Sequence, residues 1–169
     1  VELKAEGKDD GEAQDAPRTS EETAREVEPA PVMQPDTPKE LPQVMIVEDT
    51  MELAEVIQAT LERMNMTTYH ESHGNKALDR LKAIDPDVVL LDIHLPDMTG
   101  WKILDAIKEK YGEDSASTKS PIVIVITAYG DPANRLVGKL QGVHSYLIKP
   151  FTSDEIEKVV TQALNSPAL

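Results

Sequence analysis

Four short apolar runs, rich in β-branched residues, divide the later part of the chain, and a segment of helical periodicity follows each of them. Runs of this length and composition predict buried parallel strands. A more polar run over residues 66–70 predicts a weaker strand at a sheet edge. The apolar runs cover residues 44–47, 88–91, 122–126 and 146–148.

Apolar residues recur between and after these strands at the spacing of amphipathic helices. Pro86 is expected to follow the end of the second helix, Pro132 suits the first turn of the fourth, and Ser153 suits the cap of the last. The alternation predicts an α/β fold, a (βα)₅ doubly wound parallel five-stranded sheet. Placing the polar second strand at an edge gives the flavodoxin-like order 2-1-3-4-5.

Composition narrows the class of protein. The 169 residues contain 40% hydrophobic side chains but no Cys, which excludes a disulfide framework, a thiolate zinc site and a Cys nucleophile. No apolar stretch approaches the roughly 20 residues that span a bilayer, so we predict no membrane segment and a cytoplasmic location. The net charge of −14 argues against direct DNA binding by this chain.

The first 40 residues differ from the rest. They hold 12 acidic and 5 basic side chains, five prolines and no aromatic residue. Such a segment buries too little apolar surface to offset its ordering entropy, which predicts a disordered tail or linker. A partner-binding tail anchored by Val32 and Met33 is the alternative. We therefore predict a tail over 1–40, a folded domain over 41–165 and a C-terminal end over 166–169.

Ionisable and hydroxyl side chains that can bind ligands or react lie at the ends of the predicted strands. In an open parallel sheet, ligands bind outside the carboxyl ends of the strands, near the point where the winding reverses. Three carboxylates, a hydroxyl and an ammonium at one such edge predict a site for a divalent cation and a phosphoryl group. These residues are Glu48, Asp49, Asp92, Thr127 and Lys149.

Four motifs give these residues a family resemblance. They are V-M-I-V-E-D over 44–49, D-I-H-L-P-D-M-T-G over 92–100, I-T-A over 126–128 and Y-L-I-K-P-F over 146–151. Each is weak alone, but all four occur in order and at predicted strand ends. The segment 41–164 therefore resembles the CheY-like receiver domain of two-component response regulators. The resemblance does not extend to residues 1–40.

The resemblance implies Mg²⁺ as the cofactor and Asp92 as the phosphoacceptor. Mg²⁺ prefers carboxylate, water and phosphate oxygens. Asp49 and Asp92 are expected to be direct ligands, and Glu48 is expected to hold a coordinated water. The main-chain carbonyl of His94, and not its imidazole, is the further ligand that the family implies.

The family also implies roles for residues after the fourth and fifth strands. Lys149 supplies a positive charge to the phosphoryl oxygens, the Thr127 hydroxyl supplies a donor, and the small Ala128 lets its peptide N–H approach. The Lys149–Pro150 bond is a candidate cis peptide.

Two further roles concern switching and the lifetime of the phosphorylated state. Thr127 and Tyr146 are expected to move together on phosphorylation and so repack the face made by the fourth helix, fifth strand and fifth helix. A buried core tyrosine is the alternative for Tyr146. His94 and Tyr129 occupy the positions that tune hydrolysis of the aspartyl phosphate in the family.

The expected function is that of a phosphoacceptor signalling domain and not of a conventional enzyme. Its donor would be a histidine kinase or a histidine phosphotransfer protein, and its output would pass through a partner or a further domain. A Mg²⁺-dependent phosphatase or mutase fits less well, because His94 stands where that class places its second acid. A pseudo-receiver that takes no phosphate conflicts with the complete site, and both nucleotide-binding glycine motifs are absent. His70 and His73 are expected to be surface histidines and not a metal pair.

Overall fold

The computed structural model of the chain describes residues 11, 40–112, 119–128 and 132–166, so the predicted tail lies outside this part except for Gly11 and Glu40. Within these ranges, no helix is long and apolar enough to cross a membrane. Strands and helices alternate as the sequence predicts. In chain order they are β1 (Gln43–Val47), α1 (Met51–Arg63), β2 (Thr67–Glu71), α2 (Gly74–Ala83), β3 (Val88–Asp92), α3 (Gly100–Tyr111), β4 (Ile122–Thr127), α4 (Pro132–Leu140), β5 (Ser145–Ile148) and α5 (Ser153–Asn165).

The five strands form one parallel sheet in the order β2-β1-β3-β4-β5, which confirms the predicted topology. The polar strand β2 lies at an edge, as predicted. It begins at Thr67 and not at Met66, because the Met66 amide donates to the Leu61 carbonyl at 3.1 Å and so belongs to the end of α1. The first amide of the strand, that of Thr67, donates instead to Pro42 O at 2.9 Å.

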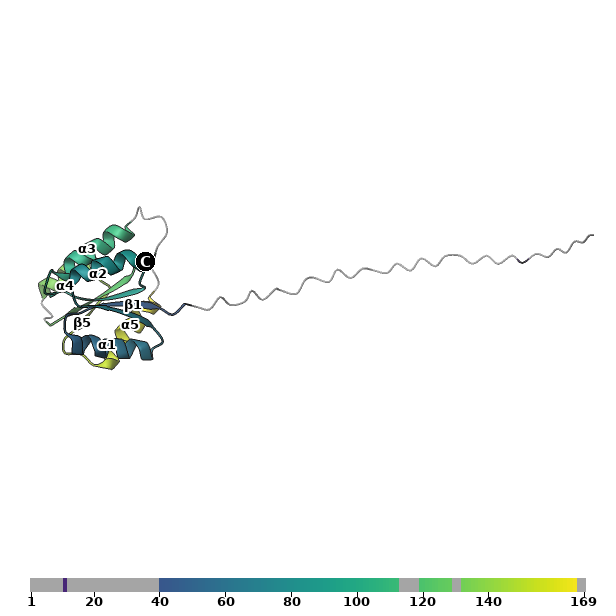
Figure 1. Cartoon of the computed structure of the whole chain (residues 1–169), viewed down its shortest axis with the longest axis horizontal. Helices are drawn as coiled ribbons and strands as arrows, with labels where there is room; N and C mark the ends of the chain where they lie inside the picture. The colour runs from purple at the N-terminus through teal and green to yellow at the C-terminus, as the bar shows by residue number, and fades with distance from the viewer. Residues whose placement is uncertain (1–10, 12–39, 113–118, 129–131, 167–169) are drawn as a thin grey trace, which may run out of the picture. The chain divides into compact units, whose positions relative to one another are not determined.

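Helices cover both faces of the sheet, with α1 and α5 on one face and α2, α3 and α4 on the other (Figure 1). The alternation of side chains along each strand divides the core accordingly. Val44 and Ile46 pack in the cluster that includes Ile156 of α5, whereas Met45 and Val47 pack in the cluster that includes Ile103 of α3. Burial on both faces explains why the central strands are continuously apolar.

The last helix begins with a cap that differs by one residue from the prediction. Thr152, and not Ser153, is the N-cap of α5. Its hydroxyl accepts a hydrogen bond from the Glu155 amide at 3.3 Å, and the Glu155 carboxylate accepts one from the Thr152 amide at 2.7 Å. This reciprocal capping box requires Glu three residues after the cap, a spacing that Thr152 meets.

Candidate functional site

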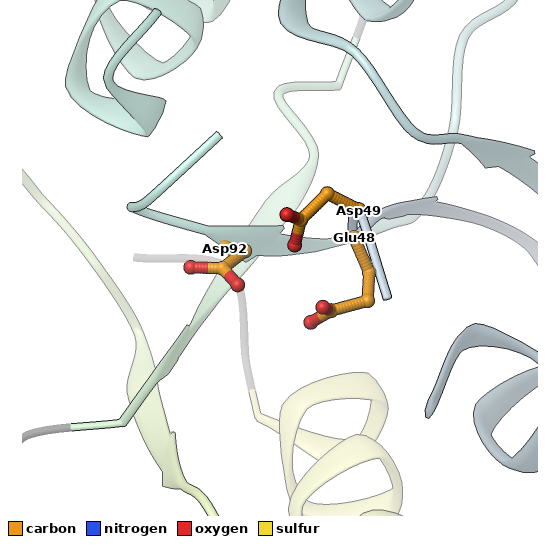
Figure 2. Close-up of side chains that lie close together, drawn as sticks. All are labelled: Glu48, Asp49 and Asp92. Atoms are coloured by element: carbon orange, nitrogen blue, oxygen red, sulfur yellow. The ribbon is translucent and has the colours of Figure 1, made fainter. Parts of the chain in front are cut away.

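Three carboxylates meet at the carboxyl ends of β1 and β3, where the winding of the sheet reverses. Val47 of β1 pairs with Leu91 of β3. The next residues along each chain segment, Glu48 and Asp92, therefore lie side by side. With Asp49 they form a group in which one carboxylate oxygen of each residue lies within 4.8 Å of the other two (Figure 2). Glu48 and Asp92 are buried, with 0% and 3% exposure, while Asp49 is exposed. The group is thus open to solvent on the Asp49 side.

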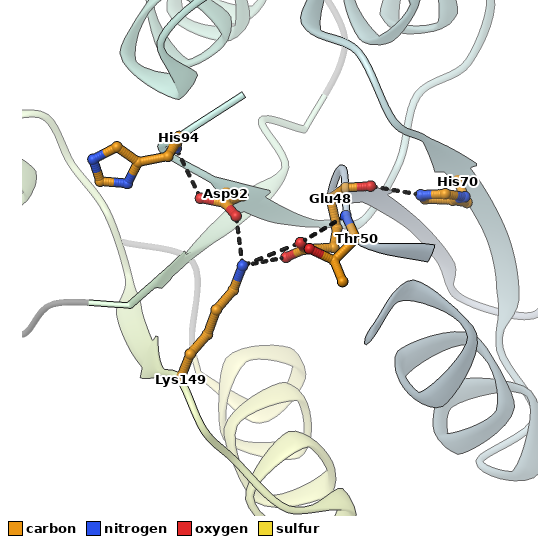
Figure 3. A network of polar contacts seen from close by, with 6 residues as sticks. All are labelled: Glu48, Thr50, His70, Asp92, His94 and Lys149. Carbon is orange, nitrogen blue, oxygen red and sulfur yellow. Dashed lines mark hydrogen bonds and ion pairs between the residues drawn. The ribbon is translucent and has the colours of Figure 1, made fainter. Parts of the chain in front are cut away.

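Lys149 joins two of these carboxylates across the sheet (Figure 3). Its Nζ lies 2.6 Å from Asp92 Oδ2, 3.1 Å from Glu48 Oε1 and 2.8 Å from Glu48 Oε2. The lysine follows β5, and its amide donates to Thr127 O at 2.8 Å, which ties its backbone to the end of β4. The Lys149–Pro150 peptide bond is cis. Four strands therefore determine where this one ammonium lies relative to the carboxylates.

Glu48 and Lys149 both have pKa values shifted by their surroundings. Burial raises the pKa of its carboxyl, although the hydrogen bonds from Lys149 and the Thr50 amide oppose this change. For Lys149, burial by itself lowers the pKa of the ammonium, but the bonds and charges of Asp92 and Glu48 outweigh it and the pKa is raised. Among the described residues, Glu48 Oε2 is a buried oxygen that accepts no hydrogen bond of good geometry, despite its contact with Nζ. A buried acceptor of this kind suits a further donor such as a coordinated water.

The remaining predicted residues lie around Asp92. The His94 amide donates to Asp92 Oδ1 at 2.8 Å, and its exposed imidazole points away from the carboxylates (Figure 3). Thr127 is buried, with 3% exposure. A cavity of about 300 Å³ opens between Asp49, Asp92, His94, Ala128 and Lys149. One cavity is therefore lined by residues from the ends of four strands, namely Asp49, Asp92, Ala128 and Lys149.

Tyr146 lies farther from the carboxylates. Its ring is half-buried and packs on the core cluster beside α2 and α3. Its hydroxyl lies so close to Gly138 of α4 that a Cβ added at Gly138 would overlap it. The ring is thus neither a fully buried core residue nor a fully exposed one. Tyr129, predicted to tune hydrolysis, lies outside the described residues.

Sequence reasoning missed two residues that contact the site's turns. His70, expected at the surface, is half-buried, and its Nε2 lies 2.8 Å from the main-chain oxygen of Glu48 (Figure 3). Asp97 accepts hydrogen bonds from the first amides of α2. His73 remains exposed, as expected. The only local signals were a histidine near a strand end and an acid inside the D-I-H-L-P-D motif, and neither identifies a partner.

The donor set is suited to one kind of chemistry. Crowded carboxylate oxygens are ligands for a hard divalent cation, which relieves their mutual repulsion. A lysine fixed between them is a point charge that binds phosphoryl oxygens. The arrangement can therefore hold a cation and a phosphoryl group side by side at Asp92.

Comparisons of sequence support a family assignment. The family described as response regulator receiver domain matches residues 44–161. The chain is 32% identical over 121 residues to the regulatory protein AtoC of Escherichia coli and 33% identical over 119 residues to the regulatory protein LuxO of Vibrio cholerae. These alignments cover 72% and 70% of this chain but only 25% of either relative. The chain thus spans about a quarter of their length.

Comparisons of structure give the same fold. The chemotaxis response regulator CheY4 of Vibrio cholerae superposes with a TM-score of 0.64 at 22% identity, over 73% of this chain and 98% of that one. The receiver domain of a sensor histidine kinase from Pseudomonas aeruginosa, solved with a magnesium ion in its active site cleft, gives 0.63 at 23% identity, over 75% and 99%. The family match, the strand order and the acidic group at the strand ends converge: this chain belongs to the receiver domains of two-component response regulators.

Proposed function

We propose that this receiver domain accepts a phosphoryl group from a partner's phosphohistidine onto Asp92, in the presence of Mg²⁺. The observation that carries the proposal is the position of the Asp92 carboxylate. It lies 2.6 Å from the Lys149 ammonium and belongs to a group of three acids, each with one oxygen within 4.8 Å of the other two. An acid held between a fixed cation and a cation-binding group is suited to act as a nucleophile toward phosphorus.

The side chains fit Mg²⁺. Asp49 and Asp92 would be direct ligands, Glu48 would hold a coordinated water, and the main-chain carbonyl of His94 would complete the protein's share. The buried Glu48 Oε2, which lacks a hydrogen bond of good geometry, supports the role given to Glu48. When bound, the ion would neutralise charge on the phosphoryl oxygens. A magnesium ion in the active site cleft of the Pseudomonas receiver domain agrees with this proposal.

The transfer requires positioning more than acid–base chemistry. An oxygen of the Asp92 carboxylate attacks phosphorus, a P–O bond forms, and the P–N bond to the donor's imidazole breaks with its electron pair leaving on nitrogen. Lys149 keeps its proton and neutralises the phosphoryl oxygens. Thr127 and the Ala128 amide would donate to them from the end of β4. The exposed Asp49 side leaves an approach for a partner.

The phosphorylated state would be read out on the face made by α4, β5 and α5. Thr127 and Tyr146 would rearrange together, since one lies at the end of β4 and the other on the adjacent strand. Gly138 is the point of α4 that the Tyr146 hydroxyl touches, so movement of the ring would change this contact. Exposed apolar side chains on this face suit a partner interface. They are Leu136, Leu140 and Ile148.

The same domain would hydrolyse its aspartyl phosphate slowly, at a rate set in part by His94 and Tyr129. Its donor would be a histidine kinase or a histidine phosphotransfer protein, and the receiver domain itself would act in the cytoplasm. The relatives AtoC and LuxO are about four times as long as the matched segment, so output could equally pass through a further domain or a separate partner. Residues 1–40 would serve as a tail or linker, with residues 41–165 forming the functional domain.

One experiment tests the proposal. Wild-type protein is incubated with acetyl phosphate and Mg²⁺, and its intact mass and beryllofluoride binding are compared with those of Asp92→Asn. Asp105→Asn, which changes an exposed acid on α3, is the matched control. We expect one added phosphoryl group in the wild type and the control, and none in Asp92→Asn. Stoichiometric labelling of Asp92→Asn, or no labelling of the wild type, would contradict the proposal.

A further inference from the structure

The corner between β2 and α2, residues 70–75, contacts both turns on which the proposed metal ligands lie. One turn follows β1 and contains Glu48 and Asp49. The other follows β3, includes His94 and Asp97, and is closed by a bridge between His94 and Thr99. We call these the β2–α2 corner, the acidic turn and the β3–α3 loop.

His70 holds the acidic turn from the side of β2. Its Nε2 lies 2.8 Å from the main-chain oxygen of Glu48. A carbonyl oxygen only accepts, so this ring nitrogen carries the proton and donates. The amide of Glu48 in turn donates to Glu71 O at 3.1 Å. Both peptide groups that flank the Glu48 side chain are therefore bound to the edge strand.

Asp97 holds the β3–α3 loop from the side of α2. Its Oδ1 accepts from the Gly74 amide at 2.8 Å and its Oδ2 from the Asn75 amide at 2.9 Å. His73, the N-cap of α2, makes no side-chain cap bond within the described residues, so Asp97 satisfies these first-turn donors from another part of the chain. The amide of Asn75 contributes most to lowering the pKa of Asp97, although residual burial acts in the opposite direction.

Packing reinforces this attachment. The Met98 side chain lies against Gly74, where an added Cβ would overlap it. The loop is closed at its base, because the Gly100 amide donates to Ile93 O at 2.9 Å. Next to Ile93, the His94 amide donates to Asp92 Oδ1 at 2.8 Å. A displacement of the loop at Asp97 would therefore shift the Asp92 carboxylate, which is the proposed nucleophile.

We propose that the β2–α2 corner is a positioning platform that sets the spacing between the acidic turn and the β3–α3 loop, with His70 and Asp97 as its two contacts. The inference rests on the proposed function and deepens it. The ladder between β1 and β3 ends at Val47 and Leu91, so the turns beyond it need another support. Mg²⁺ requires near-octahedral oxygens at about 2.0–2.1 Å, and small shifts of either turn would weaken its binding.

Mg²⁺ affinity of the isolated protein tests the platform. His70→Leu removes the imidazole donor, and Asp97→Ala removes the carboxylate. Each should raise the Mg²⁺ dissociation constant about tenfold, the lower end of the effect of groups that orient metal ligands. The matched controls are His144→Leu, an exposed histidine just before β5, and Asp79→Ala, an exposed acid on α2. The controls should change the constant less than about twofold.

Rescue separates positioning from simple stability. His70→Gln restores an N–H donor and should recover most of the lost affinity. At saturating Mg²⁺, His70→Leu and Asp97→Ala should approach the wild-type maximal rate of labelling by acetyl phosphate, since the nucleophile and Lys149 are unchanged. Thermal unfolding without Mg²⁺ is measured beside each titration. Asp97 is exposed, so Asp97→Ala gives a folded test even where His70→Leu does not.

The outcomes are distinct. Weaker Mg²⁺ binding in both variants, with rescue by Gln, supports the platform. Unchanged dissociation constants together with lower melting temperatures would show a structural role only and overturn it, while leaving the proposed function intact. A wild-type protein that binds no Mg²⁺ would overturn both the platform and the proposed function.

Discussion

Two lysine side chains at opposite ends of the sheet bind carboxylates in contrasting surroundings. Lys149 lies at the carboxyl ends of the strands, between Asp92 and Glu48, whose side chains are 4% and 0% exposed. Asp49 adds a third acid within 4.8 Å. One ammonium therefore contacts two carboxylates that are shielded from solvent, and a third acid lies beside them.

Lys110 belongs to the last turn of α3, and its ammonium reaches the segment that precedes β3. Its Nζ is 2.8 Å from Asp85 Oδ1, and the same oxygen accepts from the Tyr111 hydroxyl at 2.6 Å. The ammonium also donates to Leu81 O and, at 3.0 Å, to Ile84 O. The side chain of Asp85 is 57% exposed. Here one ammonium meets one carboxylate and two carbonyls, so the charges balance.

The contrast appears in the two carboxyl groups. Burial raises the pKa of Glu48, whereas the hydrogen bond from Lys110 lowers the pKa of Asp85. A lysine partner is present in both cases, so the difference comes from solvent access and from the number of competing acids. In the exposed pair, the charge of Asp85 is balanced by that of Lys110. The carboxylates around Lys149 retain an excess of negative charge, which a bound cation can neutralise.

The largest predicted effect comes from Lys149→Met, which removes the only ammonium contacting Glu48 and Asp92 among the described residues. Two buried carboxylates would be left without it, and we expect a loss of about 3 kcal/mol in the free energy of unfolding at pH 8. Without Lys149 the pKa of Glu48 would rise further. The folded state would then bind a proton more readily than the unfolded chain, so the loss should be smaller at pH 5.

Urea unfolding at both pH values measures this effect, with Lys110→Met as the matched control. The control should lose under about 1 kcal/mol, because its partner is largely exposed. Equal losses in the two variants would mean that burial does not distinguish the two lysines.

The second prediction concerns excess charge. Asp49→Asn removes one of three crowded carboxylates, so without Mg²⁺ we expect the unfolding free energy to rise by about 1 kcal/mol. The same variant should lose the stabilisation by Mg²⁺, which for the wild type is about 2.7 kcal/mol at 100 times the dissociation constant. Thermal unfolding with and without Mg²⁺ tests both effects, with Asp79→Asn as the control. An Asp49→Asn variant that Mg²⁺ still stabilises would remove Asp49 from the ligand set.

The smallest effect is expected at Asp85. Its lowered pKa means that its stabilising contribution is present above the ordinary value of 3.8 and is lost as the pH falls below it. Asp85→Asn should therefore destabilise the protein at pH 7 by no more than about 0.5 kcal/mol, because the pair is exposed. The difference from the wild type should vanish near pH 2. A difference that grows on acidification would contradict the direction of this shift.

Much of the fold was predictable because strand burial and helix periodicity are local patterns. The apolar run 88–91 predicted a buried strand, and the polar run ending in His70 predicted a strand at a sheet edge. The predicted N-cap of α5 was wrong by one residue. Thr152 and Ser153 are both good caps, and only the position of Glu155 decides between them. Asp92, Asp49 and Lys149 were predictable as a group because each lies at the carboxyl end of a strand of one parallel sheet.

The sequence by itself determined the order of the elements, the edge at which the polar residues gather and the residue types available there. The tertiary structure decided which atoms meet. The contact of His70 with the Glu48 carbonyl depends on the register between an edge strand and its neighbour, and the bonds from α2 to Asp97 join residues 22 and 23 positions apart. No local pattern encodes such contacts, because they arise only when the separate segments pack against a shared core.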